Sequence, residues 1–174
     1  MWKRITVFGA LALAGVTGAL FTATAFSDYH GTGNSGPVFL AELSGDNEVP
    51  PVDTDTGGVS RVMFNEDLSR VNFMLVVDKG VGVTMAHIHC GAEGENGPVA
   101  VWLAGQHPAL DGEAVGWDVD GIWVGDASAS NSNIVPTDCG QTLEELAQAM
   151  ADGNMYVNVH NVENPGGVVR GQLR

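Results

Sequence analysis

The sequence has few positive charges. It contains 7 lysine and arginine residues against 21 aspartate and glutamate residues, and its formal net charge at pH 7 is −14. Such a surface repels the phosphates of nucleic acids and of anionic membranes, so neither is an expected partner. The acidic residues are scattered along the chain instead of forming one block, which is typical of a solvated surface.

Several signatures of catalysis and nucleotide binding are missing as well. The glycine-rich segment 91–98 contains no GK[ST] or G-x-G-x-x-G motif that follows a strand and opens a helix. The segment 118–121 begins like a calcium loop but lacks the closing glutamate of an EF-hand, and we interpret it as a turn. We also find no Ser-His-Asp set and no paired-carboxylate motif. The sequence therefore gives no support to hydrolytic or nucleotide-dependent chemistry.

The N-terminus has the features of an export signal. Lys3 and Arg4 precede an apolar run over residues 5–21, and Ala23-Thr24-Ala25 offers the small-x-small pattern that signal peptidase accepts. A retained anchor helix is the alternative, although the run is short for a membrane span. No cysteine follows the run, so a lipid anchor is not expected.

Three regions follow from this interpretation. We expect a secretory signal peptide over residues 1–25, a flexible leader over 26–37 and one domain over 38–174. The leader contains His30, which we expect to be exposed. Cleavage would change the net charge from −14 to −16, because Lys3 and Arg4 are the only charged residues removed. The expected location is the periplasm or the extracellular space.

Cysteine is scarce, with only Cys90 and Cys139 in the chain. In an exported protein an even pair indicates a disulfide, and closing a loop of about 50 residues would stabilise the fold by about 4 kcal/mol. Thiolate ligation of a metal is the alternative. If the strand that carries His87 and His89 continues through Cys90, its sulfur lies on the face opposite the two histidines. This alternation favours the disulfide.

The remaining sequence is rich in short segments of β pattern. Apolar and polar residues alternate, or β-branched residues dominate, over residues 38–43, 58–64, 69–77, 84–90, 99–103, 154–161 and 168–173. Thr142 and Glu145 form a capping box that opens a short amphipathic helix, and Gly153 ends it. We predict an all-β fold, an antiparallel Greek-key-like sandwich or flattened barrel of about eight strands with one short helix.

Three of the five histidines lie on predicted strands. Side chains two residues apart share one face of a strand, so His87 and His89 project together about 7 Å apart. On the strand 154–161, His160 likewise lies opposite the aliphatic residues, with Asn158 on the same face as a second-sphere candidate. The alternations predict a metal site of His87, His89 and His160. The alternative is that these histidines are hydrogen-bonded strand residues without a metal.

The chemistry of this site indicates which metal it would hold. Three neutral imidazoles suit copper or zinc and leave one position open for water or substrate. Copper is available outside the cytoplasm, and a histidine site prefers copper(II) among the first-row divalent ions. We therefore expect a type 2 mononuclear copper site, with zinc as the alternative. Met85 and Met155 fall on the opposite face and are expected in the core.

Several motifs resemble those of one known family, the CHRD domain. This domain is named for chordin, a secreted antagonist of growth factors, and it is widespread in exported bacterial proteins. The resemblance covers residues 39–173 and keeps the order of the family's motifs. The motifs are Leu43-Ser44-Gly45, Glu48-Val49-Pro50-Pro51, Ala86-His87-Ile88-His89, Gly94-Glu95-Asn96-Gly97-Pro98-Val99, Tyr156-Val157-Asn158-Val159-His160 and Asn164-Pro165-Gly166-Gly167-Val168-Val169-Arg170-Gly171-Gln172-Leu173.

A weaker similarity connects the chain to the copper half of Cu,Zn superoxide dismutases. It implies that His87, His89 and His160 are copper ligands and that Arg170 is the cation near a substrate anion. His107 is a candidate fourth ligand, but the dense His/Asp zinc loop of those enzymes is missing. The similarity therefore concerns the copper half alone.

Three functions remain in view. The first expectation is an exported copper-binding protein with a role in storage, delivery or redox chemistry. Such a protein would exchange its metal with a protein partner. A copper-dependent oxidoreductase of the superoxide dismutase type is the alternative, with Arg170 as its catalytic cation. The third is an extracellular interaction module in which the histidines have no metal role. The negative charge disfavours fast capture of an anion such as superoxide, so we rank binding first.

Overall fold

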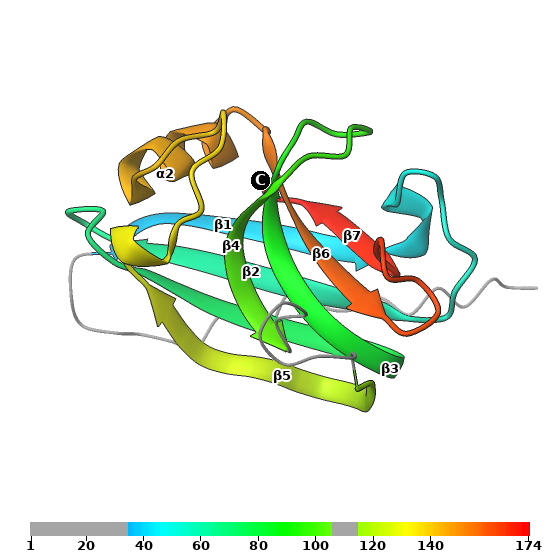
Figure 1. The fold of residues 1–174 in the computed structure, drawn as a ribbon. Helices are drawn as coiled ribbons and strands as arrows, with labels where there is room; N and C mark the ends of the chain where they lie inside the picture. The colour runs from blue at the N-terminus through cyan, green and yellow to red at the C-terminus, as the bar shows by residue number, and fades with distance from the viewer. Residues whose placement is uncertain (1–34, 106–114) are drawn as a thin grey trace, which may run out of the picture. The chain divides into compact units, whose positions relative to one another are not determined.

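The computed structural model describes residues 35–105 and 115–174, and most of these residues lie in antiparallel β-strands (Figure 1). Two short 3-10 helices, η2 (Gly45–Asn47) and η3 (Asn131–Asn133), and one α-helix, α2 (Leu143–Ala151), interrupt them in this part of the chain. The strands are β1 (Ser35–Ser44), β2 (Gly57–Asn65), β3 (Val71–Cys90), β4 (Val99–Gly105), β5 (Trp117–Ala129), β6 (Met155–Asn161) and β7 (Val169–Gln172).

Strand β3 organises the sheet. Its first half pairs with β2 and β5, and its second half pairs with β6 and β4. Strand β1 pairs with β2 on one side and with β7 on the other, and β7 pairs with β6. The ring β1-β2-β3-β6-β7 therefore closes into a barrel, with β4 and β5 as additional neighbours of β3. The predicted all-β class and the barrel-like arrangement are confirmed.

The inside of the barrel is aliphatic, and its residues come from alternate positions of the strands. Burying each such side chain stabilises the fold by about 1.5–3 kcal/mol. Fully buried examples are Val62, Leu75, Ile88, Val157 and Leu173. Strand β6 is unusual because all seven of its residues are buried. Its second face, which carries His160, is therefore covered by other parts of the protein and needs internal hydrogen-bond partners.

The strands differ from the prediction in number and in length. We predicted about eight, and the described residues contain seven. The segments 69–77 and 84–90 were predicted separately but belong to one strand of 20 residues, because the residues between them continue β3 with register shifts around Gly80. Lys79 and Gly82 have positive φ values of 51° and 59°, so the chain bends here without leaving the sheet.

Strand β5 was not predicted. Its residues are largely exposed, and only Val124 and Ala129 are buried among its 13 residues. Its register with β3 shifts at several places, so buried and exposed positions do not keep a strict period of two along the strand. The pairing with β3, and not the local sequence, therefore determines its conformation.

Helix α2 matches the prediction. Thr142 accepts a hydrogen bond from the Glu145 backbone N–H, and Glu145 reaches back to the Thr142 N–H, so the capping box is present. Leu143, Leu146 and Met150 are buried beneath the helix. None of the helices within residues 35–105 and 115–174 has the length and apolar character required to span a membrane.

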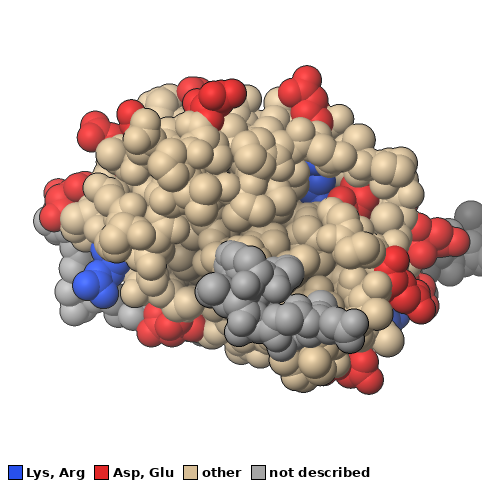
Figure 2. Space-filling view, in the orientation of Figure 1, with Lys and Arg blue, Asp and Glu red and all other residues tan. Residues whose placement is uncertain are grey.

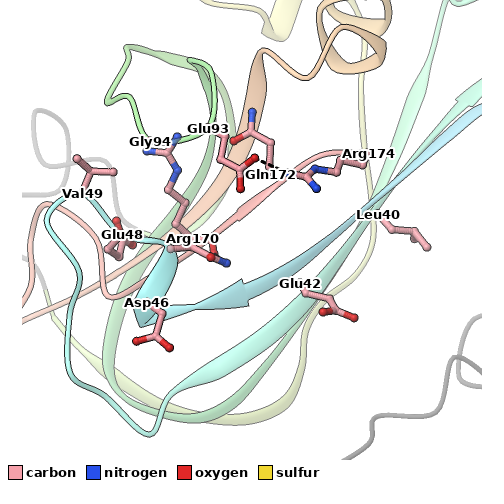
Figure 3. A pocket seen from close by; sticks show the side chains of 11 residues that line it. Leu40, Glu42, Asp46, Glu48, Val49, Glu93, Gly94, Arg170, Gln172 and Arg174 are labelled. Atoms are coloured by element: carbon pink, nitrogen blue, oxygen red, sulfur yellow. Dashed lines mark hydrogen bonds and ion pairs between the residues drawn. The ribbon is translucent and has the colours of Figure 1, made fainter.

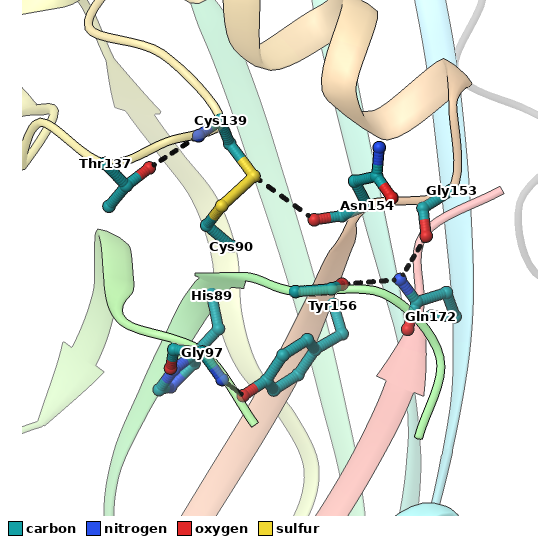
Figure 4. The surroundings of a disulfide bond; sticks show 10 residues. His89, Cys90, Gly97, Thr137, Cys139, Gly153, Asn154, Tyr156 and Gln172 are labelled. Atoms are coloured by element: carbon teal, nitrogen blue, oxygen red, sulfur yellow. Dashed lines mark hydrogen bonds between the residues drawn. A yellow bond between two sulfur atoms is a disulfide. The ribbon is translucent and has the colours of Figure 1, made fainter. Parts of the chain in front are cut away.

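The predicted disulfide is also present. Cys90 at the end of β3 and Cys139 in the segment before α2 are joined, with their Cα atoms 5.6 Å apart (Figure 4). Cys90 follows His89, so its side chain leaves the strand on the opposite face. The disulfide therefore anchors the end of β3 without occupying the face of the histidines.

Candidate metal centre

The antiparallel pairing of β3 with β6 brings three histidines onto one face of the sheet. His89 pairs with Tyr156 and His87 with Asn158, while His160 lies opposite Met85. One nitrogen from each of His87, His89 and His160 lies within 4.8 Å of the others. The structure thus brings together the three histidines that the sequence assigned to one site.

Two backbone carbonyls orient the imidazoles of His89 and His160. His89 Nδ1 lies 2.9 Å from Gly97 O, and His160 Nδ1 lies 3.0 Å from Pro165 O. A carbonyl oxygen can only accept, so both Nδ1 atoms must carry the hydrogen. The Nε2 atoms of both rings then keep a lone pair, the state that a metal ligand requires. Such hydrogen bonds to the second ring nitrogen are the usual support of histidine ligands.

The third imidazole makes a different contact. His87 Nδ1 lies 2.9 Å from His160 Nε2. Because His160 Nε2 has no hydrogen, His87 Nδ1 donates in this bond. Metal binding at this nitrogen would move its hydrogen to Nε2 of the same ring, without releasing a proton. His89 Nε2 is buried and has no hydrogen-bond partner among the described residues, which is rare for a polar atom. A ligand site explains this buried lone pair.

All three imidazoles are buried, and burial keeps those of His89 and His160 neutral. The exposed fractions of His87, His89 and His160 are 2%, 9% and 5%. Burial lowers the pKa of His160 to about 4, with the Pro165 carbonyl opposing and His89 adding to the effect. Burial also lowers the pKa of His89, against the hydrogen bond to Gly97. Neither ring has to lose a charge before it can bind a metal near pH 7.

Two aromatic side chains form the walls of the cluster. The Trp102 ring on β4 packs against His87, with centroids 4.0 Å apart at an interplanar angle of 67°. The Tyr156 ring stacks on His89, with centroids 4.9 Å apart at 10°. The Tyr156 hydroxyl accepts a hydrogen bond from the Gly97 N–H, whose carbonyl orients His89 (Figure 4). Tyr156 therefore supports His89 both directly and through the loop.

Arg170 on β7 lies behind Tyr156. Its exposed fraction is 2%, and its guanidinium carbon is 3.4 Å from the centroid of the Tyr156 ring. The guanidinium donates to Ala92 O at 2.8 Å and to Asn96 Oδ1 at 3.3 Å. These bonds hold the 91–98 loop against the sheet, and Gln172 adds a hydrogen bond to Gly91 O. The predicted catalytic cation is thus engaged with the loop that carries Gly97.

A buried carboxyl group completes this region. Glu48 is 6% exposed and accepts a hydrogen bond of 2.6 Å from Asn158 Nδ2. Burial raises the pKa of Glu48 to about 7, although Arg170 and Asn158 act in the opposite direction. Glu48 and Arg170 line a cleft of about 520 Å³, and the Glu93–Arg174 ion pair also borders it (Figure 3). Asn158, which bonds Glu48, is also the β6 residue that pairs with His87.

The remaining predicted residues are accounted for as follows. Met155 is fully buried in the core, as expected, and Cys90 is in the disulfide. The prediction for Met85 was wrong: Met85 is only partly buried, and because it lies two positions before His87 and pairs with His160, it is on the same face as the histidines. Asn158, a second-sphere candidate, hydrogen-bonds Glu48 and not a histidine. His30 and His107 lie outside the described residues.

Sequence patterns assigned no role to Trp102, Tyr156 or Glu48 at this site. Trp102 pairs with His87 across β3 and β4, a relation that depends on strand order and register. Tyr156 had one usable signal, because it shares the alternation of Asn158 and His160. Glu48 reaches Asn158 from 110 positions away, and no local pattern predicts such a contact.

Comparison with known proteins identifies a family and no individual relative. No curated protein and no solved structure matches the chain. The CHRD domain model matches residues 39–173, which cover the barrel, the disulfide and all three histidines of the cluster. This match covers more than half of the chain, and the protein belongs to the CHRD domain family.

Proposed function

We propose that this protein is an exported copper-binding protein that holds one copper ion through His87, His89 and His160. The observation that carries the proposal is the set of histidine nitrogens that lie close to one another. Among them, His89 Nε2 is buried without a hydrogen-bond partner among the described residues. The carbonyls of Gly97 and Pro165 select the tautomers that leave Nε2 available on His89 and His160. Histidines with only a packing role would not require such an arrangement.

Copper fits this ligand set better than the other first-row metals. The cluster offers three neutral nitrogen atoms, and it includes no carboxylate or thiolate among the described residues. Calcium and magnesium prefer oxygen ligands. Among divalent metals that accept imidazole, affinity is highest for copper. Zinc is the alternative, because three histidines with one open position also suit it.

Storage or delivery of copper agrees with the surroundings of the site. The three histidines are at most 9% exposed, so a diffusing substrate has little direct access to them. Acidic side chains are spread around the face in Figure 2, and the net charge is −14. This charge slows the approach of anions. A protein partner would then exchange metal with the site, and a basic partner surface would suit the acidic one.

A redox role is the second candidate function. It would use Arg170 as the cation near a substrate anion, as in the superoxide dismutases that the motif resembles. Arg170 is close to His89 through Tyr156, which favours an electrostatic influence on the site. Its donors are directed to Ala92 and Asn96, so direct contact with an anion would require these bonds to open. A superoxide assay of the copper-loaded protein and of Arg170→Ala distinguishes the two roles.

The proposed location is the periplasm or the extracellular space. The signal sequence over residues 1–25 and the leader to residue 37 remain predictions, and β1 begins within that leader at Ser35. The disulfide supports an oxidising compartment, because cytoplasmic proteins rarely keep one. N-terminal sequencing of the protein recovered from culture would identify the cleavage site.

Metal analysis tests the proposal. Protein purified without chelators and reloaded with copper is expected to hold one ion per chain, and a His87→Ala/His89→Ala variant is expected to hold almost none. His30→Ala is the matched control, because it removes a histidine outside the family domain. Equal copper content in the wild type and the double variant would contradict the proposal and favour the interaction module. Stoichiometric zinc that copper fails to displace would assign the site to zinc.

A further inference from the structure

One cation is buried beside the histidine cluster. The Arg170 guanidinium and the His89 ring both contact the Tyr156 ring, at 3.4 Å and 4.9 Å. These two distances place the guanidinium within about 8 Å of the His89 ring. An arginine side chain stays charged at all physiological pH values. The cluster therefore experiences a fixed positive charge in a region from which solvent is largely excluded.

The ligands themselves carry no negative charge. The three residues of the cluster are histidines, and burial holds His89 and His160 in their neutral form. The nearest buried carboxyl in the network, Glu48, is bonded to Asn158. Its raised pKa of about 7 leaves it only partly ionised near neutral pH, so it offsets the charge of Arg170 incompletely. The surrounding side chains would thus neutralise little of the positive charge of a bound metal ion.

The cost of burying an ion rises steeply with its charge. A dication in a dry site with neutral ligands and a nearby cation is disfavoured more strongly than a monocation. Copper is the metal in the proposed set that can be held in either charge state. Copper(I) also forms stable complexes with three soft or borderline ligands, whereas copper(II) prefers four or more ligands.

We propose that the site selects copper(I) over copper(II), and that Arg170 is a specificity-determining residue for this preference. The inference rests on the proposed function, since it concerns the copper held by the three histidines. It also favours copper over zinc, because zinc is available only as a dication. Arg170 acts here through its charge and touches no ligand, so it is a positioning and electrostatic residue and not a catalytic one.

The expected contribution of Arg170 is about tenfold. A bound ion would lie somewhat farther from the guanidinium than the His89 ring does. A unit charge at about 10 Å, in an effective dielectric of about 20, changes the relative affinity for ions that differ by one charge by roughly this factor. A tenfold change in the ratio of the two dissociation constants corresponds to about 59 mV in the midpoint potential of a one-electron couple. Removing the charge should therefore lower the potential by about that amount.

The first measurement uses the wild-type protein. Dissociation constants are obtained for copper(I), under anaerobic conditions with a copper(I)-specific chelator as competitor, and for copper(II), with an amino-acid competitor. We expect the constant for copper(I) to be at least tenfold lower. Equal constants, or tighter binding of copper(II), would overturn the inference and leave the proposed function intact. Failure to bind either ion would overturn the proposed function itself.

Variants then assign the preference to the arginine. Arg170→Gln should lower the midpoint potential by about 59 mV, while Arg170→Lys should keep it near the wild-type value because the charge remains. Arg70→Gln is the matched control, since it removes the same charge from an exposed position on the surface. A potential that is unchanged in Arg170→Gln, or lowered equally in Arg70→Gln, would contradict the assignment.

A fourth variant covers the case in which Arg170→Gln does not fold. Glu48→Gln removes the opposing negative charge and keeps an oxygen that can accept from Asn158. Measured at pH 8, where the wild-type carboxyl is largely ionised, it should shift the potential in the opposite direction, upward. A downward shift or none would overturn the electrostatic explanation.

Discussion

His87 Nδ1 lies 2.9 Å from His160 Nε2, and this contact joins two strands across 73 positions of sequence. It couples the tautomers of the two rings, because His160 Nδ1 donates to Pro165 O and leaves Nε2 as the acceptor. The hydrogen on His87 Nδ1 therefore occupies the place where a metal would bind. The imidazoles of His89 and His160 are neutral in this arrangement, because burial lowers the pKa of both.

Copper binding at pH 7 should release few protons, because there is no imidazolium to deprotonate. Calorimetric titration in two buffers of different ionisation enthalpy measures the number released. We expect well under one proton per copper ion at pH 7, with little change down to pH 6. Release of one or more protons would show that a ligand is protonated in the metal-free protein, against the assigned tautomers.

Gly167 is expected to be irreplaceable for steric reasons. Its φ is +137°, and a Cβ atom there would lie 2.4 Å from Asn158 Nδ2 and 2.6 Å from Glu48 Oε1. Gly167→Ala should reduce the free energy of unfolding by about 2 kcal/mol or more, through backbone strain and displacement of this pair. The neighbouring Gly166 has open space around it, so Gly166→Ala is the control. Chemical denaturation that gives the same loss for both would contradict this account.

Removing the disulfide should cost stability and weaken the site. The Cys90–Cys139 bond closes a loop of 49 positions, so Cys90→Ser/Cys139→Ser is expected to lose about 4 kcal/mol of unfolding free energy. Cys90 N–H also donates to Pro98 O, beside the Gly97 carbonyl that orients His89, so copper affinity should fall as well. Dithiothreitol added to the double variant is the control for the stability measurement and should leave the free energy of unfolding unchanged. Copper affinity is measured without it, because thiolates bind copper. Full copper affinity in the variant would show that the loop needs no covalent anchor.

Two buried groups should give the protein opposite dependences of stability on pH. Burial lowers the pKa of His160 from 6.5 to about 4, so the unfolded chain binds an extra proton in this window and stability is lost as pH falls from 6.5 to 4. Burial raises the pKa of Glu48 from 4.5 to about 7. The folded protein binds the extra proton there, and stability is lost as pH rises from 4.5 to 7.

His89 and His160 both oppose the effect of Glu48 in the wild type, and variants separate the two directions. His89→Asn/His160→Asn should leave a stability that declines between pH 4.5 and 7, by roughly 3 kcal/mol on the scale of the Glu48 shift. Glu48→Gln should leave a stability that rises between pH 4 and 6.5 by a similar amount. Denaturation of the metal-free proteins at several pH values measures both slopes. Parallel curves for the two variants would contradict the assigned pKa directions.

Local patterns predicted the ligand set because strand alternation is a local property. His87 and His89 had to share a face, and His160 had to lie opposite the aliphatic residues of its own strand. The disulfide followed from two cysteines and the same alternation. Helix α2 was identified by its capping box, whose two residues are three positions apart.

The rest of the site depends on contacts between distant segments. The packing of Trp102 on His87 requires the β3–β4 register, which is shifted by irregularities on both sides of that pair. Glu48 meets Asn158 only because β1 and β7 close the barrel. Strand β5 is exposed along most of its length, so its pairing with β3 left no periodic pattern in the sequence.

X-ray absorption spectroscopy of the copper-loaded protein tests the central claim most directly, because it reports the ligands in either oxidation state. We predict a nitrogen shell that includes three imidazoles, reduced to two in the single variant His89→Ala. A first shell of sulfur or oxygen without imidazole scattering, or an identical spectrum in the variant, would contradict a copper site formed by His87, His89 and His160.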